Sequence, residues 1–445
     1  MNTGPGWTHC RMRLLRSALA AFSISLSLSG LSLAHAADSY DGQYLTIPRV
    51  AVGNTIYTDV VITVGSIVGV EGVPPAANFD TYDSATGLLS IPAVQAFGST
   101  YNNVTITVGS VISVGGSFSS RNYPVVDTHA HIDGSASLAL GVPSALEAMQ
   151  RNGITHTILM PPPRAAVEPG RDGQNLISAI NGHQDKLFVS TGGGILNGFI
   201  QTTSAQAVTA ADRQSFLAQA NNLAAMPVAG FGEIALRHLS LVVSGPTHAY
   251  EDTPGDHPLL FALADLAAQK GLPIDIHCDL APQDMDLPPY PVPVFNPTTP
   301  AHLTENRSGF ERLLAHNRST KIVWAHAGND PLKTRDPVLE RTLLSTHSNL
   351  YMSLRIGPGS GAPSDIFGVQ PTIKSAWLAL LQDFPDRFVL GSDYFHTPAA
   401  ATNANRDQTE QNLQRIAKLL DQLPIELAKK IAYQNAVSLF GLTLP

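Results

Sequence analysis

From residue 125 onward, short apolar runs alternate with longer stretches in which apolar residues recur every three or four positions. Short apolar runs bounded by turn residues are typical of buried strands, and the longer period is typical of amphipathic helices. Eight such runs predict strands at 125–128, 155–160, 187–190, 228–234, 273–277, 321–325, 349–354 and 387–391. The helical pattern predicts helices at 143–151, 214–224, 258–270, 309–316, 337–345, 407–420 and 426–439. This α/β order predicts a (β/α)8 TIM barrel over residues 121–445.

Residues 37–120 follow a different pattern, in which Val, Ile and Thr alternate with polar residues between Gly, Pro and Asp. This two-residue period is typical of β-hairpins. The segment also repeats itself after about 44 residues, as VVITVGS at 60–66 and VTITVGS at 104–110 show. We therefore predict a small N-terminal all-β repeat domain, joined to the barrel by a linker at 115–122. It carries no cluster of catalytic residue types, so it serves either as a module for surface or protein contact or as an inert spacer.

Residues 1–36 have the composition of a secretory signal peptide. Three arginines precede an uncharged, small and apolar stretch at 17–33, and Ala34-His35-Ala36 fits an A-x-A cleavage site. An uncleaved membrane anchor is the alternative, although the run is rich in Ser and only marginally long enough to span a bilayer. We expect cleavage near Ala36, export to the periplasm of a Gram-negative bacterium, and no integral membrane association afterwards.

Charge and cysteine content narrow the class of partner. The formal net charge of −8 argues against nucleic acid, because phosphate binding needs a basic surface. The hydrophobic fraction of 44% supports a large core. Cys10 and Cys278 are the two cysteines of the chain, so signal cleavage leaves one thiol and no internal disulfide. We expect a small-molecule substrate, and the sequence leaves a homo-oligomer open.

Polar residues end several of the predicted barrel strands, where TIM barrels place their catalytic groups. The candidates for metal ligands are His129, His131, Glu233, His277, His326 and Asp393. Taken singly, each candidate also has a purely structural explanation. These are a chance histidine pair, an ion pair between Glu233 and Arg237, or a histidine bonded to a backbone carbonyl. Taken together at successive strand ends, these imidazole and carboxylate groups indicate a site for Zn²⁺ or a similar ion. Cys278 faces away from His277 by strand alternation and is predicted to be a packed thiol.

The ordered set resembles the amidohydrolase superfamily. DTHAH at 127–131, AHAG at 325–328, GSD at 391–393 and IAYQNAVSLFGL at 431–442 look like motifs of that family. The last of these is similar to the branch of amidohydrolase-related hydrolases and aminocarboxymuconate-semialdehyde-type decarboxylases. The resemblance spans about residues 125–442 and leaves out the N-terminal repeats.

The resemblance implies a divalent metal cofactor, expected to be Zn²⁺, with one or two ions per chain. It implies a first ion on His129, His131, His277 and Asp393, and a second held with Glu233 and His326. In relatives with a single metal, the histidine that matches His326 polarises the substrate or the attacking water instead. The carboxylated lysine that many relatives carry on strand four is missing, and Glu233 takes its place.

Three functions follow as hypotheses. The leading one is a metal-dependent hydrolase in which activated water attacks an amide, ester or lactone. In that reaction Asp393 acts as general base and then acid, while His326 and Glu233 complete the catalytic group. The alternatives are a metal-dependent non-oxidative decarboxylase of the same branch and a catalytically silent binding barrel.

Four residues near strand ends are candidates for substrate binding: Arg164, Arg237, Arg355 and His396. An arginine binds a substrate carboxylate through two parallel hydrogen bonds. A structural ion pair is the alternative for each arginine, and capping of a loop is the alternative for His396.

Overall fold

The computed structural model describes residues 38–444 apart from 54, 72–79, 115, 120, 133–136, 246–247, 358, 360 and 397–403. The side chains of 116–119 and 404–410 also lie outside the description. The predicted signal peptide at 1–36 falls outside the described residues. In the part of the chain that is described, no helix has the length and apolar character needed to cross a membrane.

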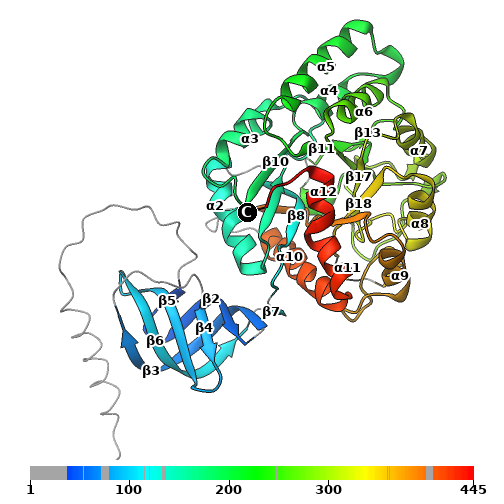
Figure 1. Ribbon diagram of the computed structural model, residues 1–445. Helices are drawn as coiled ribbons and strands as arrows, with labels where there is room; N and C mark the ends of the chain where they lie inside the picture. Colours follow the sequence, from blue (N-terminus) through cyan, green and yellow to red (C-terminus); the bar gives the residue numbers. More distant parts are fainter. Residues whose placement is uncertain are drawn as a thin grey trace, which may run out of the picture. The chain divides into compact units, whose positions relative to one another are not determined.

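Eight parallel strands form a closed barrel, as the sequence predicts (Figure 1). They are β8 (Val126–Ile132), β9 (His156–Leu159), β10 (Leu187–Gly192), β11 (Gly230–Ala235), β14 (Ile274–His277), β17 (Ile322–Ala327), β18 (Leu350–Leu354) and β19 (Phe388–Leu390). Leu390 on β19 pairs with Asp127 on β8, and this pairing closes the ring. A further strand, β20 (Tyr394–His396), pairs in parallel with the end of β8.

Helices connect the strands and cover the outside of the barrel (Figure 1). They are α2 (Leu138–Asn152), α3 (Gln174–Ala179), α4 (Leu196–Thr202), α5 (Ala210–Ala224), α6 (Pro258–Lys270), α7 (Arg307–His316), α8 (Pro337–Thr346), α9 (Ser375–Asp383), α10 (Ala404–Gln422), α11 (Ile425–Lys429) and α12 (Asn435–Phe440). Local chemistry fixes their ends: α5 starts at a capping box of Thr209 and Asp212, and α6 and α8 start with proline.

The predicted start of the first barrel helix at residue 143 is wrong. Helix α2 starts at Leu138, because Ser137 caps it by accepting a hydrogen bond from the Leu140 amide. Pro143 lies inside the helix, in its second turn, where the missing amide proton removes one hydrogen bond of the helix. At the other end Gly153 adopts a left-handed conformation with φ of 69° and closes the helix.

Apolar residues of the strands and helices form the main core. Trp324 on β17 is buried, and its indole N–H donates to the carbonyl of Cys278 at 3.0 Å. Cys278 itself is fully buried, and burial raises the pKa of its thiol to about 12. The prediction of a packed thiol is therefore confirmed, because a thiol of this kind is neutral and sheltered from solvent.

The N-terminal strands form a separate sheet with an internal repeat, as predicted (Figure 1). Its strands are β1 (Asp38–Tyr40), β2 (Tyr44–Val52), β3 (Thr55–Val70), β4 (Asp80–Asp83), β5 (Leu88–Ala96), β6 (Ser99–Ser113) and β7 (Gly116–Ser119). β2–β3 and β5–β6 are antiparallel hairpins whose strands start at 44 and 55 and at 88 and 99, an offset of 44 residues. The first strand of each repeat also pairs in parallel with the other repeat, β1 on β5 and β4 on β2.

The two repeats interlock through reciprocal contacts between β3 and β6. The Thr107 hydroxyl accepts the Ser66 amide at 2.8 Å, and the Thr63 hydroxyl accepts the Ser110 amide at the same distance. Each threonine occupies the space where the opposite glycine would carry a Cβ. That atom would lie 2.6 Å from Thr107 Oγ1 at Gly65 and 2.5 Å from Thr63 Oγ1 at Gly109. Glycine is therefore required at both positions by the approach of the other repeat.

Candidate metal centre

The six predicted ligands come together at the carboxyl ends of the barrel strands. His129 and His131 lie on β8, Glu233 on β11, His277 on β14 and His326 on β17, and Asp393 follows β19. All six are buried or nearly so; Asp393, whose side chain is 13% exposed, is the most accessible. Parallel strands of a closed barrel end on one face, so residues far apart in the sequence meet there.

Glu233 lies between two groups of imidazoles. Its Oε2 is 3.4 Å from Nε2 of His131 and 3.5 Å from Nε2 of His129. Its Oε1 is 2.8 Å from Nδ1 of His277 and 3.2 Å from Nε2 of His326. One carboxylate therefore presents a separate oxygen to each group, which is the arrangement of a bridging ligand.

The first group consists of His129, His131 and Asp393. The two Nε2 atoms are 3.2 Å apart, and Oδ1 of Asp393 lies 3.2 Å from Nε2 of His131 and 3.8 Å from Nε2 of His129. Three donor atoms at these separations can hold one ion at their centre. Neighbouring strands explain the grouping, because β19 pairs with β8.

The second group consists of His277, His326 and the other oxygen of Glu233. Nδ1 of His277 and Nε2 of His326 are 3.1 Å apart. The family resemblance implies a different grouping, with His277 beside His129, His131 and Asp393, and that assignment stays a prediction. In the structure β14 pairs with β17, so His277 lies next to His326.

The charges in this cluster favour a cation. Burial raises the pKa of a carboxyl group, but His129 and the other imidazoles hold the pKa of Glu233 well below its usual range. Burial lowers the pKa of an imidazole, but Asp279 and Glu233 raise the pKa of His277 to about 10. His326 lies where burial prevails and lowers its pKa to about 3, which keeps its ring neutral and able to bind a metal.

Two of the candidates have left-handed backbone conformations. The φ angle is 68° at His326 and 53° at Asp393. Such angles are unfavourable for residues with a Cβ and persist where the surroundings impose them, most often at functional sites. Here they turn the chain at the ends of β17 and β19, which brings both side chains to the cluster.

Oxygen atoms outside the cluster contact the remaining ring nitrogens. The carbonyl of Met160 accepts from Nδ1 of His131 at 2.9 Å, and Oδ2 of Asp279 lies 3.1 Å from Nε2 of His277. Oδ1 of Asp275 lies 3.2 Å from Nδ1 of His129. Metal-binding histidines usually have such partners, which hold the ring and fix its tautomer.

Asp275 and Asp279 were not among the residues predicted from the sequence. Both lie two residues from His277, so strand alternation would have placed all three on one face. That face is a usable signal, although it does not say which histidine each carboxylate contacts. A further missed pair is His238 and Glu251, in which Nδ1 of His238 lies 3.2 Å from Oε2 of the buried Glu251. The His238 ring packs against the His277 ring with centroids 4.3 Å apart.

Asp127 has a structural role beneath the ligands. Its carboxylate accepts the Ser392 amide at 2.9 Å and the Ser392 hydroxyl at 2.5 Å. It also accepts the amide of His129 at 3.3 Å. These bonds tie β8 to the chain that follows β19, immediately before Asp393, and so fix the spacing between the two strand ends.

The predicted substrate-binding residues occupy four different environments. Arg355 belongs to the centre, because its Nη1 lies 2.9 Å from Oδ2 of Asp393. Arg237 is buried and forms two parallel hydrogen bonds with Asp252, at 3.1 and 3.0 Å. This geometry favours the structural ion pair as the role of Arg237.

The other two candidates do not join the cluster by any direct contact. Arg164 is half-buried and pairs with Glu168, with Nε 3.2 Å from Oε2. His396 on β20 is buried, packs its ring against Tyr394, and has no hydrogen-bond partner at either ring nitrogen among the described residues. Burial lowers its pKa to about 3, so the ring is neutral.

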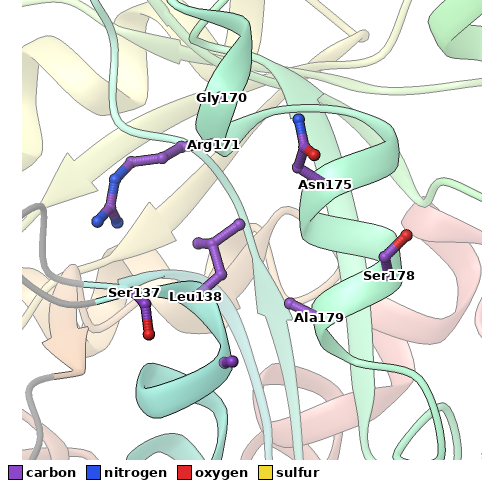
Figure 2. Close-up of a pocket in the computed structure, with 8 residues that line it drawn as sticks. Ser137, Leu138, Gly170, Arg171, Asn175, Ser178 and Ala179 are labelled. Atoms are coloured by element: carbon purple, nitrogen blue, oxygen red, sulfur yellow. The ribbon is translucent and has the colours of Figure 1, made fainter.

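A separate pocket of about 490 Å³ lies beside the start of α2 (Figure 2). Ser137 and Leu138 line it from α2, and Asn175 and Ser178 line it from α3. Arg171, in the short 3-10 helix Pro169–Arg171, lines it as well. None of the six candidate ligands contributes to its wall.

A divalent ion fits the donor set of the cluster. Imidazole nitrogen and carboxylate oxygen are the ligands that Zn²⁺ and related transition ions prefer. A buried carboxylate surrounded by four imidazoles needs positive charge nearby, because an unpaired buried charge is costly. The residues present therefore suit one ion on each side of Glu233.

A closed (β/α)8 barrel with a buried histidine–carboxylate cluster at its strand ends defines a class of barrel enzymes. Within that class the chain belongs to the amidohydrolase family, whose family model matches residues 126–442. The match covers the whole barrel and supports an enzyme of hydrolase or related type. A comparison with curated proteins finds no match.

Solved structures give a fold-level likeness only. A probable 2-pyrone-4,6-dicarboxylic acid hydrolase from Acinetobacter baumannii is 14% identical, with 72% of this chain and 99% of that chain covered and a TM-score of 0.36. An amidohydrolase 2 from Bifidobacterium longum subsp. infantis is 14% identical, with 72% and 100% covered and a TM-score of 0.38. An amidohydrolase from Pseudomonas aeruginosa is 11% identical, with 72% and 98% covered and a TM-score of 0.36.

Proposed function

We propose that this protein is a metal-dependent hydrolase that cleaves an amide, ester or lactone. One observation carries the proposal: Glu233 directs one oxygen at His129 and His131 and the other at His277 and His326. This arrangement supports two divalent ions, with Zn²⁺ as the expected metal, and Glu233 would help to hold both. His129, His131 and Asp393 would hold one ion, and His277 and His326 would hold the other.

Bound ions of this kind polarise a carbonyl group and lower the pKa of a water ligand to about 7. The residues of the chain supply the proton transfer. Asp393 is the candidate general base, because Oδ1 faces the ligand cluster and Oδ2 faces Arg355. Asp393 would take the proton of the attacking water and return it to the leaving group. With a single ion bound, His326, kept neutral by burial, would instead orient the carbonyl oxygen.

Arg355 also influences the basicity of Asp393. Burial raises the pKa of the Asp393 carboxyl, but Arg355 and the nearby imidazoles hold it well below its usual range. A carboxyl group with so low a pKa is a weak base. A substrate anion that attracts Arg355 would release Asp393 and restore its basicity, so binding of the substrate would activate the base.

The same contact favours a second candidate function. A non-oxidative decarboxylase needs a cation beside the metal to bind the substrate carboxylate, and Arg355 lies 2.9 Å from Asp393. The expected export of the chain to the periplasm favours the hydrolase over this alternative. We also propose that the protein acts there on a small molecule, with the N-terminal repeats free to contact a surface or another protein.

Metal analysis tests the proposal directly. We expect the purified protein to contain about two Zn²⁺ ions per chain, and the His129→Ala and Asp393→Ala variants to contain less. If the stability of the metal-free protein did not change on addition of Zn²⁺, this result would contradict the proposal. Turnover of esters, lactones or amides without release of CO₂ supports the hydrolase, and CO₂ release from an aromatic carboxylate supports the decarboxylase.

A further inference from the structure

Asp275 is a buried carboxylate that lies close to one polar group, the Nδ1 atom of His129. It lies on β14, two residues before His277, and its exposed fraction is 0%. No described residue donates a well-aligned hydrogen bond to either of its oxygens. Oδ1 lies 3.2 Å from Nδ1 of His129, across the barrel mouth from its own strand neighbours.

Gly232 on β11 packs directly against Asp275. A Cβ on Gly232 would lie 2.7 Å from Cβ of Asp275, closer than such atoms approach in proteins. Leaving a buried carboxylate without hydrogen bonds is unfavourable, and core positions normally exclude it. A carboxylate kept under these conditions is a candidate for a functional role.

His129 directs its two nitrogens to different partners. Nε2 faces the cluster, 3.2 Å from Nε2 of His131 and 3.5 Å from Oε2 of Glu233. Nδ1 faces Asp275. An ion bound to Nε2 uses the lone pair of that atom, so the proton of the neutral ring must be on Nδ1. That N–H group then needs an acceptor, and Oδ1 of Asp275 lies within reach.

We propose that Asp275 is the positioning residue of His129. Its carboxylate accepts a hydrogen bond from Nδ1–H and so holds the ring with Nε2 directed at the metal. The inference rests on the proposed metal-dependent function. The other ligands follow the same scheme, since Met160 contacts Nδ1 of His131 and Asp279 contacts Nε2 of His277. Asp279 has a second partner, because it also accepts a hydrogen bond from the Leu239 amide at 2.9 Å. The close polar contact of Asp275 among the described residues is with His129 alone.

The test measures Zn²⁺ affinity and metal-free stability in the full-length chain. Asp275→Asn keeps the shape of the side chain but weakens it as an acceptor. We expect its Zn²⁺ affinity, measured by competition with a chromogenic chelator, to fall about 10- to 100-fold. We expect the melting temperature of the metal-free variant to stay within about 4 °C of the parent. Asp275→Glu, which retains the carboxylate, should recover part of the affinity.

Glu340→Gln is the matched control. Glu340 on α8 is also fully buried, and neither of its oxygens has a hydrogen-bond partner among the described residues. Among the described residues, no hydrogen bond or ion pair joins Glu340 to any of the six candidate ligands. Its substitution should therefore leave the Zn²⁺ affinity unchanged.

Each other outcome overturns the inference. Parent-like Zn²⁺ affinity in Asp275→Asn removes the positioning role, and a loss of affinity with a larger fall in metal-free stability assigns Asp275 to the fold instead. If the Asn variant does not fold, Asp275→Ser is judged by the same two measurements. A parent protein that binds no Zn²⁺ refutes the proposed function itself, which distinguishes that failure from a failure of Asp275 alone.

Discussion

At the scale of single residues, Glu233 decides how the centre is organised. It is buried, and each oxygen faces a different pair of imidazoles. His129 and His326 also lie close to each other, but Glu233 is the carboxylate that contacts imidazoles of both groups. We therefore expect the number of ions bound to depend on this side chain.

We expect Glu233→Gln to lower the metal content from about two ions per chain to about one or fewer, because an amide is a poor bridging ligand. Metal analysis of purified protein after removal of excess Zn²⁺ is the measurement. Glu251→Gln is the control, since Glu251 is buried beside His238 but contacts no ligand directly. A Glu233→Gln protein that retains the full metal content would show that the two groups bind ions independently.

Arg355 and Arg237 should respond differently to substitution. Arg355→Met removes the cation beside Asp393, so we expect kcat/KM for an anionic substrate to fall at least tenfold with little change in stability. Arg237→Met breaks two charge-assisted hydrogen bonds to Asp252 and should lower the free energy of unfolding by about 2 kcal/mol. Urea unfolding and steady-state kinetics of both variants make the comparison, and the reverse pattern would exchange the two assignments.

Strand order is the element-scale feature that shapes the centre. All eight barrel strands are where the hydrophobic pattern predicts them, because buried parallel strands give short apolar runs that are easy to recognise. The six candidate ligands follow from the same pattern, since they stand at the strand ends. Their division between ions stays a prediction, because the sequence pattern does not show that the pairing of β14 with β17 places His277 beside His326.

Other features lay beyond the sequence for physical reasons. The cap at Ser137 outweighs the usual preference of Pro143 for a helix start, so the start of α2 was misplaced. The contact between Asp275 and His129 joins two strands that are not neighbours, and its distance depends on the diameter of the barrel. The partner of Arg237 is Asp252 on β13 (Glu251–Asp252), a two-residue strand too short for any periodicity to reveal.

The N-terminal sheet gives an element-scale prediction of pH dependence. Asp38 on β1 and Asp80 on β4 are buried and hydrogen-bonded to each other. Burial raises the pKa of Asp38 to about 7 and, with the charge of Asp38, raises the pKa of Asp80 to about 9. Both folded values lie above the ordinary value of 3.8, so the protonated pair favours folding. This contribution is complete below about pH 4 and is lost as the pH rises through about 7 and then 9.

We therefore expect amide hydrogens of β2 and β5 to be better protected at pH 5 than at pH 8, after correction for intrinsic exchange rates. Hydrogen exchange followed by mass spectrometry of the full chain measures this. Asp80→Asn should reduce the difference without abolishing it, because one buried carboxyl is removed while burial still raises the pKa of Asp38. Asp83→Asn is the control, since Asp83 is an exposed residue of the same strand. Equal protection at both pH values in the parent would contradict the prediction.

At the scale of the whole molecule, the chain contains an N-terminal β-rich region and a barrel, each with its own sheet. The metal-centre candidates all belong to the barrel, and the family match begins at residue 126. The boundary at residue 120 stays a prediction of the sequence pattern. Its consequence is that the barrel should fold and bind metal without the repeats.

Deletion of residues 37–119 from the chain tests this division. We expect the shortened protein to keep the circular dichroism of an α/β barrel and the metal content of the parent, because the barrel has its own closed sheet and core. Aggregation or loss of cooperative unfolding in the shortened chain would mean that the two parts form one folding unit. A fusion of 37–120 to an unrelated carrier is the complementary measurement for the repeat domain.

The exchange of threonine and glycine between β3 and β6 has a consequence for the origin of the repeat domain. Each repeat contains both a threonine and the glycine against which the threonine of the other repeat packs. The contact is therefore self-complementary. Two separate copies of a single repeat would carry everything needed to form the same contact about a true two-fold axis. The domain thus has the design of a homodimer joined into one polypeptide, which is the outcome expected when the gene of a small dimeric ancestor duplicates and fuses.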